Sequence, residues 1–470
     1  MKPNVLSKMG QRTAGPPISW LIQSALTRPK LISLAAGFTD NASLPVELSR
    51  KLLNDILRSP KTGQPALQYG VTAGETNLRT LTAKHLQKLD GVAATPSSQT
   101  GRRGGDATHS PERVIITGGS QQLLYMTLEA LCDEGDIILV EDPTYFVFLS
   151  ILQSRGIKTR GVKLERDGID LVHLDKVLER LKQSGELHRV KALYLVTYFQ
   201  NPTGATTSLA KKSTALKLLK KYERAAGHPL YLLEDAAYRE LRFASSPSPR
   251  PSGERAGVRE FEFEIKGLLT PTLSSVGGRE GEDVPPTALT LPGAKERVIY
   301  AGTYSKPYAT GVRVGFGILP EPLYTAVLRI KGNHDFGTAN LLQQLLARAL
   351  ATGLYDRHVA KVQKNYARKA RVMKSALAEH FPANVEIWES GGGLYFWARL
   401  PKGISAGVKS KVFQTALKND VLYVPGEFCY ADDPSRAKPD NEMRISFGSA
   451  SADNIHKGIA RLGKVLRKFV

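Results

Sequence analysis

The 470-residue chain has few cysteines and no long run of apolar residues. Its two cysteines, Cys132 and Cys429, lie far apart and form no CxxC pair, so the sequence indicates neither a disulfide framework nor a zinc site. No apolar stretch reaches the roughly 20 residues of a membrane-spanning helix, and the first residues lack the apolar core of a signal peptide. We therefore expect a cytoplasmic protein with no membrane partner and no metal.

Acidic residues are scarce relative to basic ones. The chain has 65 Lys and Arg against 44 Asp and Glu, which gives a formal net charge of +21. Such an excess suits nucleic acid, a membrane surface or acidic metabolites. The basic residues are scattered, however, and His456–Val470 has the pattern of a helix with one apolar and one solvated face. No helix-turn-helix, RRM or zinc module is recognisable, so we expect no nucleic-acid partner.

Short apolar stretches that alternate with helical patterns predict an α/β fold with a mainly parallel sheet. The stretches lack strict alternation, which is typical of strands covered on both faces. Helical patterns separate several of them, as in Ser120–Cys132 and Leu209–Ala225. The predicted strands are Val114–Thr117, Ile137–Val140, Ala192–Thr197, Tyr231–Leu233, Val298–Ala301 and Val314–Leu319.

The chain divides into an arm and two domains. Residues 1–45 are expected to form an N-terminal arm that joins the small domain, residues 46–330 a large domain, and residues 331–470 a smaller α+β domain. Two stretches rich in Pro, Ser and Gly, 95–111 and 244–293, predict disordered surface insertions. A lid or a separate domain is the alternative for the second stretch.

The stretch Val298–Gly315 joins a predicted strand to a lysine, two hydroxyls and an arginine. Lys306 follows the strand, where desolvation lowers an amine's pKa and makes it a nucleophile. Thr303 and Ser305 on one side and Arg313 on the other suit a phosphate group. These residues predict a Schiff base with a phosphate-bearing aldehyde, pyridoxal phosphate. From this stretch alone, an ordinary surface lysine at a strand end explains the pattern equally well.

Two further predicted strands end in groups that suit the same cofactor. Gly119 precedes a helix that opens with Ser120 and Gln121, and the first N–H groups of a helix favour a phosphate. A glycine and serine at this position are also an ordinary helix cap. Tyr145 follows the next strand and offers a ring for stacking on a planar cofactor, or it fills a turn.

Three more positions complete the series. The Asn201 amide suits a ring oxygen, and the Asp235 carboxylate would keep a pyridine nitrogen protonated, although a helix cap is the alternative for Asp235. Arg444 lies in a strand-like stretch, where its guanidinium suits a substrate carboxylate or an ion pair with a protein acid. Each indication is weak alone, but their occurrence at successive strand ends, where α/β proteins bind ligands, points to one small molecule.

These motifs resemble those of the fold-type I, class I/II pyridoxal-phosphate aminotransferases, in the subgroup of 2-aminoadipate and kynurenine aminotransferases and the effector domains of MocR-type regulators. The resemblance covers the chain except Thr95–Pro111 and Ala244–Gly293, and it implies a central, mainly parallel sheet with helices on both faces plus a smaller α+β domain. The motifs appear in the family's order: TGGSQQ, EDPTY, NPTG, ED-x-x-Y, the SK of TYSK, G-x-R-x-G and MRISF.

The resemblance implies a role for each residue. Lys306 would hold the internal aldimine and move the Cα proton, with Asp235 at the pyridine nitrogen and Tyr145 stacked on the ring. Arg444, Asn201 and Gly37 would bind the substrate. The implied cofactor-binding residues also include Gly119, Ser120, Gln121, Asn201, Tyr238, Thr303, Ser305, Arg313 and, from the neighbouring subunit, Tyr69.

The implied activity is a ping-pong transfer of an amino group from an L-amino acid to a 2-oxo acid, with 2-oxoglutarate as expected acceptor, by a homodimer with shared active sites. A lyase or decarboxylase would use the same cofactor residues, and a MocR-like regulator would need an N-terminal DNA-binding domain, for which the arm is short. Ser19 stands where relatives that use dicarboxylic amino acids carry arginine. Trp20 and Tyr395 would favour an apolar or aromatic substrate, or they serve ordinary packing.

Overall fold

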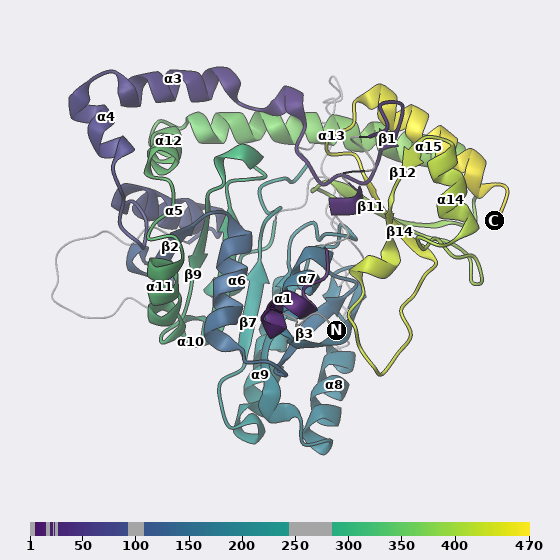
Figure 1. The fold of residues 1–470 in the computed structure, drawn as a ribbon, viewed down its shortest axis with the longest axis horizontal. Helices are drawn as coiled ribbons and strands as arrows, with labels where there is room; N and C mark the ends of the chain where they lie inside the picture. Colours follow the sequence, from purple (N-terminus) through teal and green to yellow (C-terminus); the bar gives the residue numbers. More distant parts are fainter. Residues whose placement is uncertain (1–4, 16–18, 22, 24–26, 93–107, 244–283) are drawn as a thin grey trace, which may run out of the picture.

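The computed structural model describes residues 5–15, 19–21, 23, 27–92, 108–243 and 284–470. Within these residues, eight strands form one sheet in the order β2-β9-β8-β7-β6-β3-β4-β5 (Figure 1). The strands β8, β7, β6, β3 and β4 run parallel, whereas β9 is antiparallel to both of its neighbours. Their bounds are β2 (Val114–Thr117), β3 (Ile137–Asp142), β4 (Lys158–Glu165), β5 (Gly168–Ile169), β6 (Val190–Val196), β7 (Tyr231–Asp235), β8 (Val298–Thr303) and β9 (Gly315–Ile318). The predicted mainly parallel sheet is confirmed.

Helices cover the sheet in two separate groups (Figure 1). One group packs α6 against β8 and β9 and against its neighbours α7 and α11. The other packs α8 against α9, with α9 on β7 and α8 on β4. Because both faces are covered, every residue of β2, β3, β7, β8 and β9 is buried. The helices are α6 (Ser120–Leu131), α7 (Phe146–Arg155), α8 (Leu171–Gln183), α9 (Leu209–Ala226) and α11 (Leu323–His334).

A second sheet, of four described strands in the order β10-β11-β14-β13, lies in the C-terminal part of the chain, and its pairings are antiparallel. Its strands are β10 (Glu386–Trp388), β11 (Tyr395–Arg399), β13 (Val424–Pro425) and β14 (Glu442–Ser446). The helices α13 (Leu354–His380), α14 (Lys411–Lys418) and α15 (Ala452–Leu466) accompany it. Helix α15 packs on both α13 and α14, which gives the α+β arrangement of the small domain.

The N-terminal arm reaches the small domain through a short strand. Strand β1 (Ile32–Ser33) pairs in parallel with β12 (Val421–Leu422). Before it, residues 19–21 and 23 are helical. The helix α12 (Asn340–Ala351) packs on the helices α3 (Val46–Leu57), α4 (Pro60–Leu67) and α5 (Thr76–Leu89). The exact domain boundaries stay a prediction.

The two predicted insertions lie partly outside the described residues, over 93–107 and 244–283. Where the structure resumes, the prediction of a disordered surface segment is wrong for residues 284–293, because Ala288 and Leu289 are fully buried. The backbone N–H and the hydroxyl of Thr287 both donate to the buried carboxylate of Asp90. Asp90 also contacts the buried His109 of the first predicted insertion. The last residues of both predicted insertions therefore pack against one carboxylate, and the prediction of a disordered segment is also wrong at His109.

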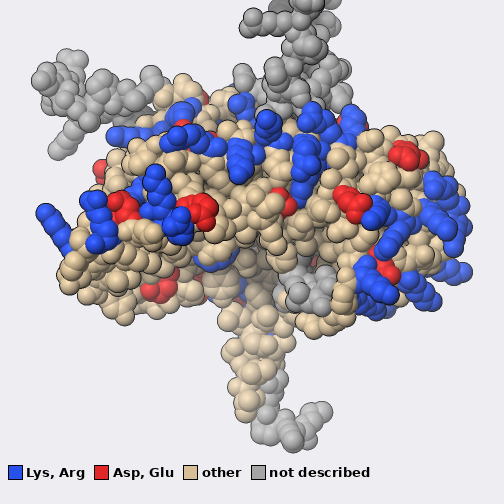
Figure 2. All heavy atoms as spheres, turned by 90° about the horizontal axis from the view of Figure 1, so that it is seen from above, with Lys and Arg blue, Asp and Glu red and all other residues tan. Residues whose placement is uncertain are grey.

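The basic excess is spread over the surface. Figure 2 shows Lys and Arg scattered over the face seen from above, with few acids between them. Exposed basic residues recur along α13, as at Lys361, Lys364 and Arg368. None of the described helices combines the length and the apolar character that crossing a membrane requires.

Candidate active site

The predicted groups meet at a cavity of about 110 Å³ at the carboxyl ends of β3, β6, β7 and β8. Of the predicted site residues, ten line this cavity: Ser120, Gln121, Tyr145, Asn201, Asp235, Tyr238, Thr303, Ser305, Lys306 and Arg313. A larger cavity of about 610 Å³, between residues 12–15, α7 and residues 427–438, contains none of them. The chemistry therefore concentrates in the smaller space, at the edge of the sheet where the parallel strands end.

Lys306 is held with its amine inside the site. Its Nζ donates a hydrogen bond of 2.9 Å to the Gly37 carbonyl, which the N-terminal arm brings from the far end of the sequence. Burial, together with the positive charges of Arg444 and Arg313, lowers the pKa of this amine to about 8. A substantial fraction of the amine is therefore neutral near physiological pH, as a nucleophile requires.

Asp235 is the last residue of β7 and its carboxylate lies at the base of the cavity. One oxygen accepts a hydrogen bond of 2.8 Å from the Tyr194 hydroxyl, and the other accepts from the Ala237 backbone N–H. Burial raises the pKa of Asp235 to about 6, while these two donors oppose the rise. A cation placed opposite this carboxylate, such as a protonated ring nitrogen, would favour its charged form.

Groups that suit an anion surround the part of the cavity where α6 begins. Gly119 precedes the helix with φ +92°, and no side chain caps the helix N-terminus. A Cβ on Gly119 would lie 2.8 Å from Arg313 Nη2, and one on Gly315 would lie 2.4 Å from the Ser120 nitrogen, so both positions require glycine. The guanidinium, the first N–H groups of α6 and the hydroxyls of Thr303 and Ser305 together suit a phosphate.

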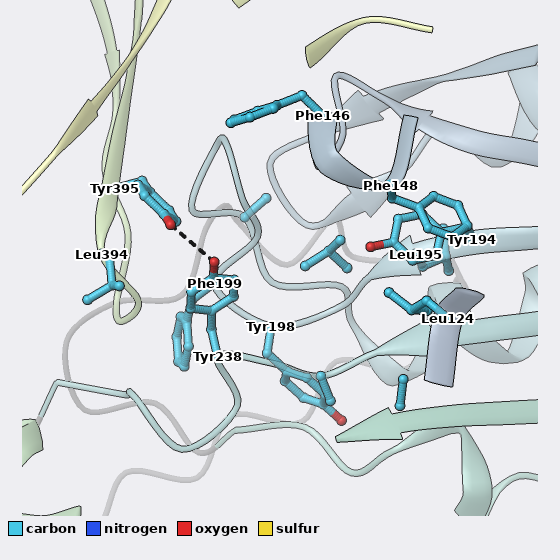
Figure 3. Packing of buried hydrophobic residues seen from close by; sticks show 14 of the residues in the cluster. Leu124, Phe146, Phe148, Tyr194, Leu195, Tyr198, Phe199, Tyr238, Leu394 and Tyr395 are labelled. Carbon is cyan, nitrogen blue, oxygen red and sulfur yellow. Dashed lines mark hydrogen bonds between the residues drawn. The ribbon is translucent and has the colours of Figure 1, made fainter. Parts of the chain in front are cut away.

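Asn201 and the aromatic residues define the sides of the cavity. The Asn201 amide nitrogen donates to the Tyr238 hydroxyl at 3.3 Å. The Tyr238 and Tyr395 hydroxyls lie 3.1 Å apart, and Figure 3 shows the two hydroxyl groups pointing toward each other from the large and small domains. Tyr145 lines the cavity from the start of α7. Its ring, the Asn201 amide and the Tyr238 hydroxyl are therefore available to a planar, oxygen-bearing ligand.

Arg444 is nearly fully buried on β14 and points toward the same site. Its Nη1 donates to Asn201 Oδ1 at 2.8 Å and its Nη2 to the Ala35 carbonyl at 2.5 Å, while its Nε is buried without a hydrogen-bond partner. Within the described part of the chain, no carboxylate forms an ion pair with Arg444, contrary to the protein-acid alternative. A buried guanidinium without a counter-charge suits an anionic ligand such as a substrate carboxylate.

Tyr69, Trp20 and Ser19 contact none of the residues that line the cavity in the hydrogen bonds and ring contacts of the described chain. Tyr69 is 82% exposed and packs its ring edge-on against Phe336, with 5.4 Å between centroids. Trp20 contacts Phe413 of α14, at 6.0 Å between ring centroids, and Ser19 is exposed. Gly37, by contrast, is at the site, and a Cβ there would lie 2.4 Å from the Tyr395 hydroxyl.

Two functional neighbours escaped the sequence analysis. Tyr194 lies in the middle of an apolar strand and no local motif marks it; only the pairing of β6 with β7 places it diagonally next to Asp235. Glu141 is fully buried, and burial raises its pKa to about 8. It accepts hydrogen bonds from Val196 N and Gln200 Nε2, and it thereby fixes the turn that carries Asn201.

The residues present fit pyridoxal phosphate. Its phosphate matches the cationic surface at α6, its ring nitrogen the Asp235 carboxylate, and its aldehyde the Lys306 amine between them. The Arg444 guanidinium, bonded to Asn201 and without a carboxylate partner among the described residues, suits the carboxylate of an amino acid.

Comparison with known proteins gives the same assignment. The model of the family described as aminotransferase class I and II matches residues 29–462. The chain is 30% identical to a 2-aminoadipate transaminase of Thermus thermophilus, over 94% of this chain and 91% of that protein. It is 24% identical to an uncharacterized HTH-type transcriptional regulator of Bacillus subtilis, over 97% of this chain and 82% of the regulator.

Among solved structures, the chain is similar to the kynurenine aminotransferase of Pyrococcus horikoshii, which was crystallised in complex with PMP. The two share 28% identity with a TM-score of 0.79, over 99% of this chain and 97% of the other. The resemblance and the fold class predicted from the motifs are thus confirmed.

Proposed function

The chain belongs to the aminotransferase class I and II family and is a transaminase with pyridoxal phosphate as its cofactor, and we propose that it transfers the amino group of an L-amino acid to 2-oxoglutarate in a ping-pong cycle. The donor leaves its amino group on the enzyme and departs as a 2-oxo acid, and the acceptor then takes the group up. The observation that carries the proposal is the placement of Lys306 and Asp235 in one cavity, with the Arg444 guanidinium bonded to the cavity residue Asn201 and paired with no carboxylate of the described residues.

The large domain would hold and tune the cofactor. When bound, pyridoxal phosphate supplies an electron sink for negative charge at the substrate Cα. The Asp235 carboxylate would keep the ring nitrogen protonated, and the hydrogen bond from the Tyr194 hydroxyl favours the charged form of that carboxylate. The phosphate would be bound by Gly119, Ser120, Gln121, Thr303, Ser305 and Arg313, and the ring by Tyr145, Asn201 and Tyr238.

Lys306 would act twice. In the resting enzyme its amine would hold the cofactor, and during turnover the same amine would move the proton at the substrate Cα. Both tasks need a neutral amine at moderate pH, which its lowered pKa provides. The hydrogen bond to the Gly37 carbonyl orients the amine toward the space between the two domains.

Arg444 would bind the α-carboxylate of donor and acceptor alike. Its guanidinium lies over the Tyr395 ring, 4.5 Å from the centroid, and this stacking together with the bond to Asn201 fixes its plane. A fixed plane allows bidentate binding of a carboxylate, which all amino acids and 2-oxo acids share. The side-chain preference must come from other residues, and Tyr395, whose hydroxyl faces Gly37, lines that region. Ser19 offers no cation for a second carboxylate.

The active enzyme would be a homodimer with shared sites. Exposed apolar residues gather around Tyr69, namely Leu67, Val71 and Phe336, on and after α4 and before α12. Such a group of exposed apolar side chains is typical of a protein interface. A second copy docked there would cover it and would carry Tyr69 to the phosphate of its neighbour.

A lyase or decarboxylase would use the same cofactor residues, and a regulatory protein would bind the cofactor without turnover. A panel of L-amino acids with 2-oxoglutarate separates the three functions. A transaminase forms one glutamate for each donor consumed. Release of ammonia or CO2 in place of glutamate would identify a lyase or a decarboxylase, and binding of donors without product would favour a regulator.

A further inference from the structure

A second group of chemically reactive side chains lies in the small domain, apart from the active site. It consists of Glu379 and His380 at the end of α13 and His456 on α15, whose ligand atoms lie within 4.8 Å of one another. We propose that these three residues bind a zinc ion that cross-links the two helices. The sequence predicted no metal, because the ligands come from distant segments without a recognisable spacing motif.

The distances match a zinc site. His380 Nε2 lies 3.5 Å from Glu379 Oε1, and His456 Nε2 lies 3.5 Å from Glu379 Oε2. Ligands about 2.0–2.1 Å from a tetrahedral zinc are roughly 3.3–3.5 Å apart. Each histidine nitrogen lies at such a separation from one oxygen of the carboxylate, His380 from Oε1 and His456 from Oε2. With one ligand atom from each residue, the three atoms lie within 4.8 Å of one another, and the His456 side chain is half-exposed.

His380 also has an unsatisfied nitrogen. Its Nε2 is buried and has no hydrogen-bond partner in the described part of the chain. Buried polar atoms without partners are rare in folded proteins, and an unseen ion is one established cause. Two imidazoles and one carboxylate form the donor set of many zinc sites and suit zinc better than magnesium or calcium. The exposed side of Glu379 leaves room for water as the fourth ligand.

The two helices hold the ligands in place without the metal. Gly463 of α15 approaches the end of α13 so closely that a Cβ there would lie 2.3 Å from the His380 carbonyl oxygen. Arg467 Nη1 donates to the same carbonyl at 2.5 Å. His456, Gly463 and Arg467 follow one another at intervals of seven and four residues, so they share one face of α15. The site is therefore pre-organised, and the metal would add a link between helices that already touch.

The test uses the full-length holoenzyme, freed of metal with EDTA and titrated with ZnCl2 by calorimetry. We expect one zinc per chain with a dissociation constant in the micromolar range or below, and a higher unfolding temperature with zinc than without it. His456→Ala should weaken binding about 100-fold or more, because even outer-shell substitutions cost roughly 10–100-fold. Glu379→Gln, an exposed change that leaves the helix contacts intact, should weaken it as well.

His188→Ala, on the separate 3₁₀ helix Leu187–Arg189, is the control and should bind zinc like the wild type. The alternative without a metal is that Glu379 forms an ion pair with each histidine, which would produce the same two 3.5 Å distances. The proposal is overturned if the wild type binds no stoichiometric zinc below about 100 µM. It is equally overturned if His456→Ala and Glu379→Gln, with normal circular dichroism and bound cofactor, retain wild-type affinity.

Discussion

Arg444 Nη1 lies 2.8 Å from Asn201 Oδ1, and this bond joins β14 of the small domain to the turn after β6 of the large one. The residue proposed to bind the substrate carboxylate is thus aligned by a residue proposed to bind the cofactor ring. Closure of the two domains and the alignment of substrate over cofactor would depend on the same contact.

Arg444→Lys should raise KM for both substrates. The ammonium lacks the planar, two-pronged geometry of guanidinium, and the loss of a buried charged contact of this kind costs about 3 kcal/mol, or roughly 100-fold. Steady-state kinetics on donor and acceptor measure the effect, and the cofactor's absorption should be unchanged. Arg368→Lys, on the exposed face of α13, is the matched control. An unchanged KM would remove Arg444 from substrate binding.

Cofactor capture by the apoenzyme should speed up as pH rises from 6 to 8 and level off above. Lys306, with a pKa of about 8, is protonated and unreactive below that pH, so its reactive fraction falls about tenfold per pH unit. Asp235, with a pKa of about 6, loses its charge at the acidic end and with it the attraction for a protonated ring nitrogen. Stopped-flow absorbance measures the rate, and a rate that falls as pH rises would contradict the assignment.

Tyr194→Phe should shift the acidic part of the pH profile of cofactor capture to higher pH by about one unit. The hydroxyl donates to Asp235 and lowers its pKa, and a hydrogen bond to a charged group contributes about 1.5 kcal/mol. Phenylalanine keeps the ring that stacks on Phe148 at 3.7 Å, so packing is preserved. If the profile of this variant superimposes on that of the wild type, the hydroxyl does not tune Asp235.

Two deletions of different length should behave differently. Replacement of residues 245–283 by a short Gly-Ser linker should leave cofactor binding and turnover within about twofold, since the described contacts resume at Val284. Deletion of residues 245–292 also removes Thr287, whose two hydrogen bonds satisfy Asp90, and should cost about 3 kcal/mol of stability. Thermal unfolding compares the two. If the variant that lacks residues 245–283 binds the cofactor but no longer turns over substrate, the segment acts as a lid.

The sequence predicted the sheet and the cavity well because both depend on local patterns. Buried parallel strands have continuous apolar sequences, and their carboxyl ends meet at one edge of the sheet. The sequence alone therefore predicts that Asn201, Asp235 and Lys306 lie close together. Strand β4 was missed because it alternates buried and exposed residues and carries several charges, as a strand near the sheet edge does.

Interactions between segments that are distant in the chain could not be predicted from local sequence patterns. Tyr194 reaches Asp235 only through the register of β6 and β7, and Thr287 was assigned to an insertion because its neighbours are rich in Pro and Ser. Its burial depends on Asp90, almost 200 residues earlier, and no local pattern reports such a partner. Glu379, His380 and His456 were overlooked for the same reason.

The most direct test of the central claim is the transfer of a ¹⁵N-labelled amino group from a donor amino acid to 2-oxoglutarate, followed by mass spectrometry of the products. We predict that the label appears in glutamate in equal amount to the donor consumed, and that Lys306→Ala abolishes the transfer because it removes both the nucleophile and the proton carrier. Recovery of the label as ammonia, or labelled glutamate from Lys306→Ala at the wild-type rate, would contradict the account.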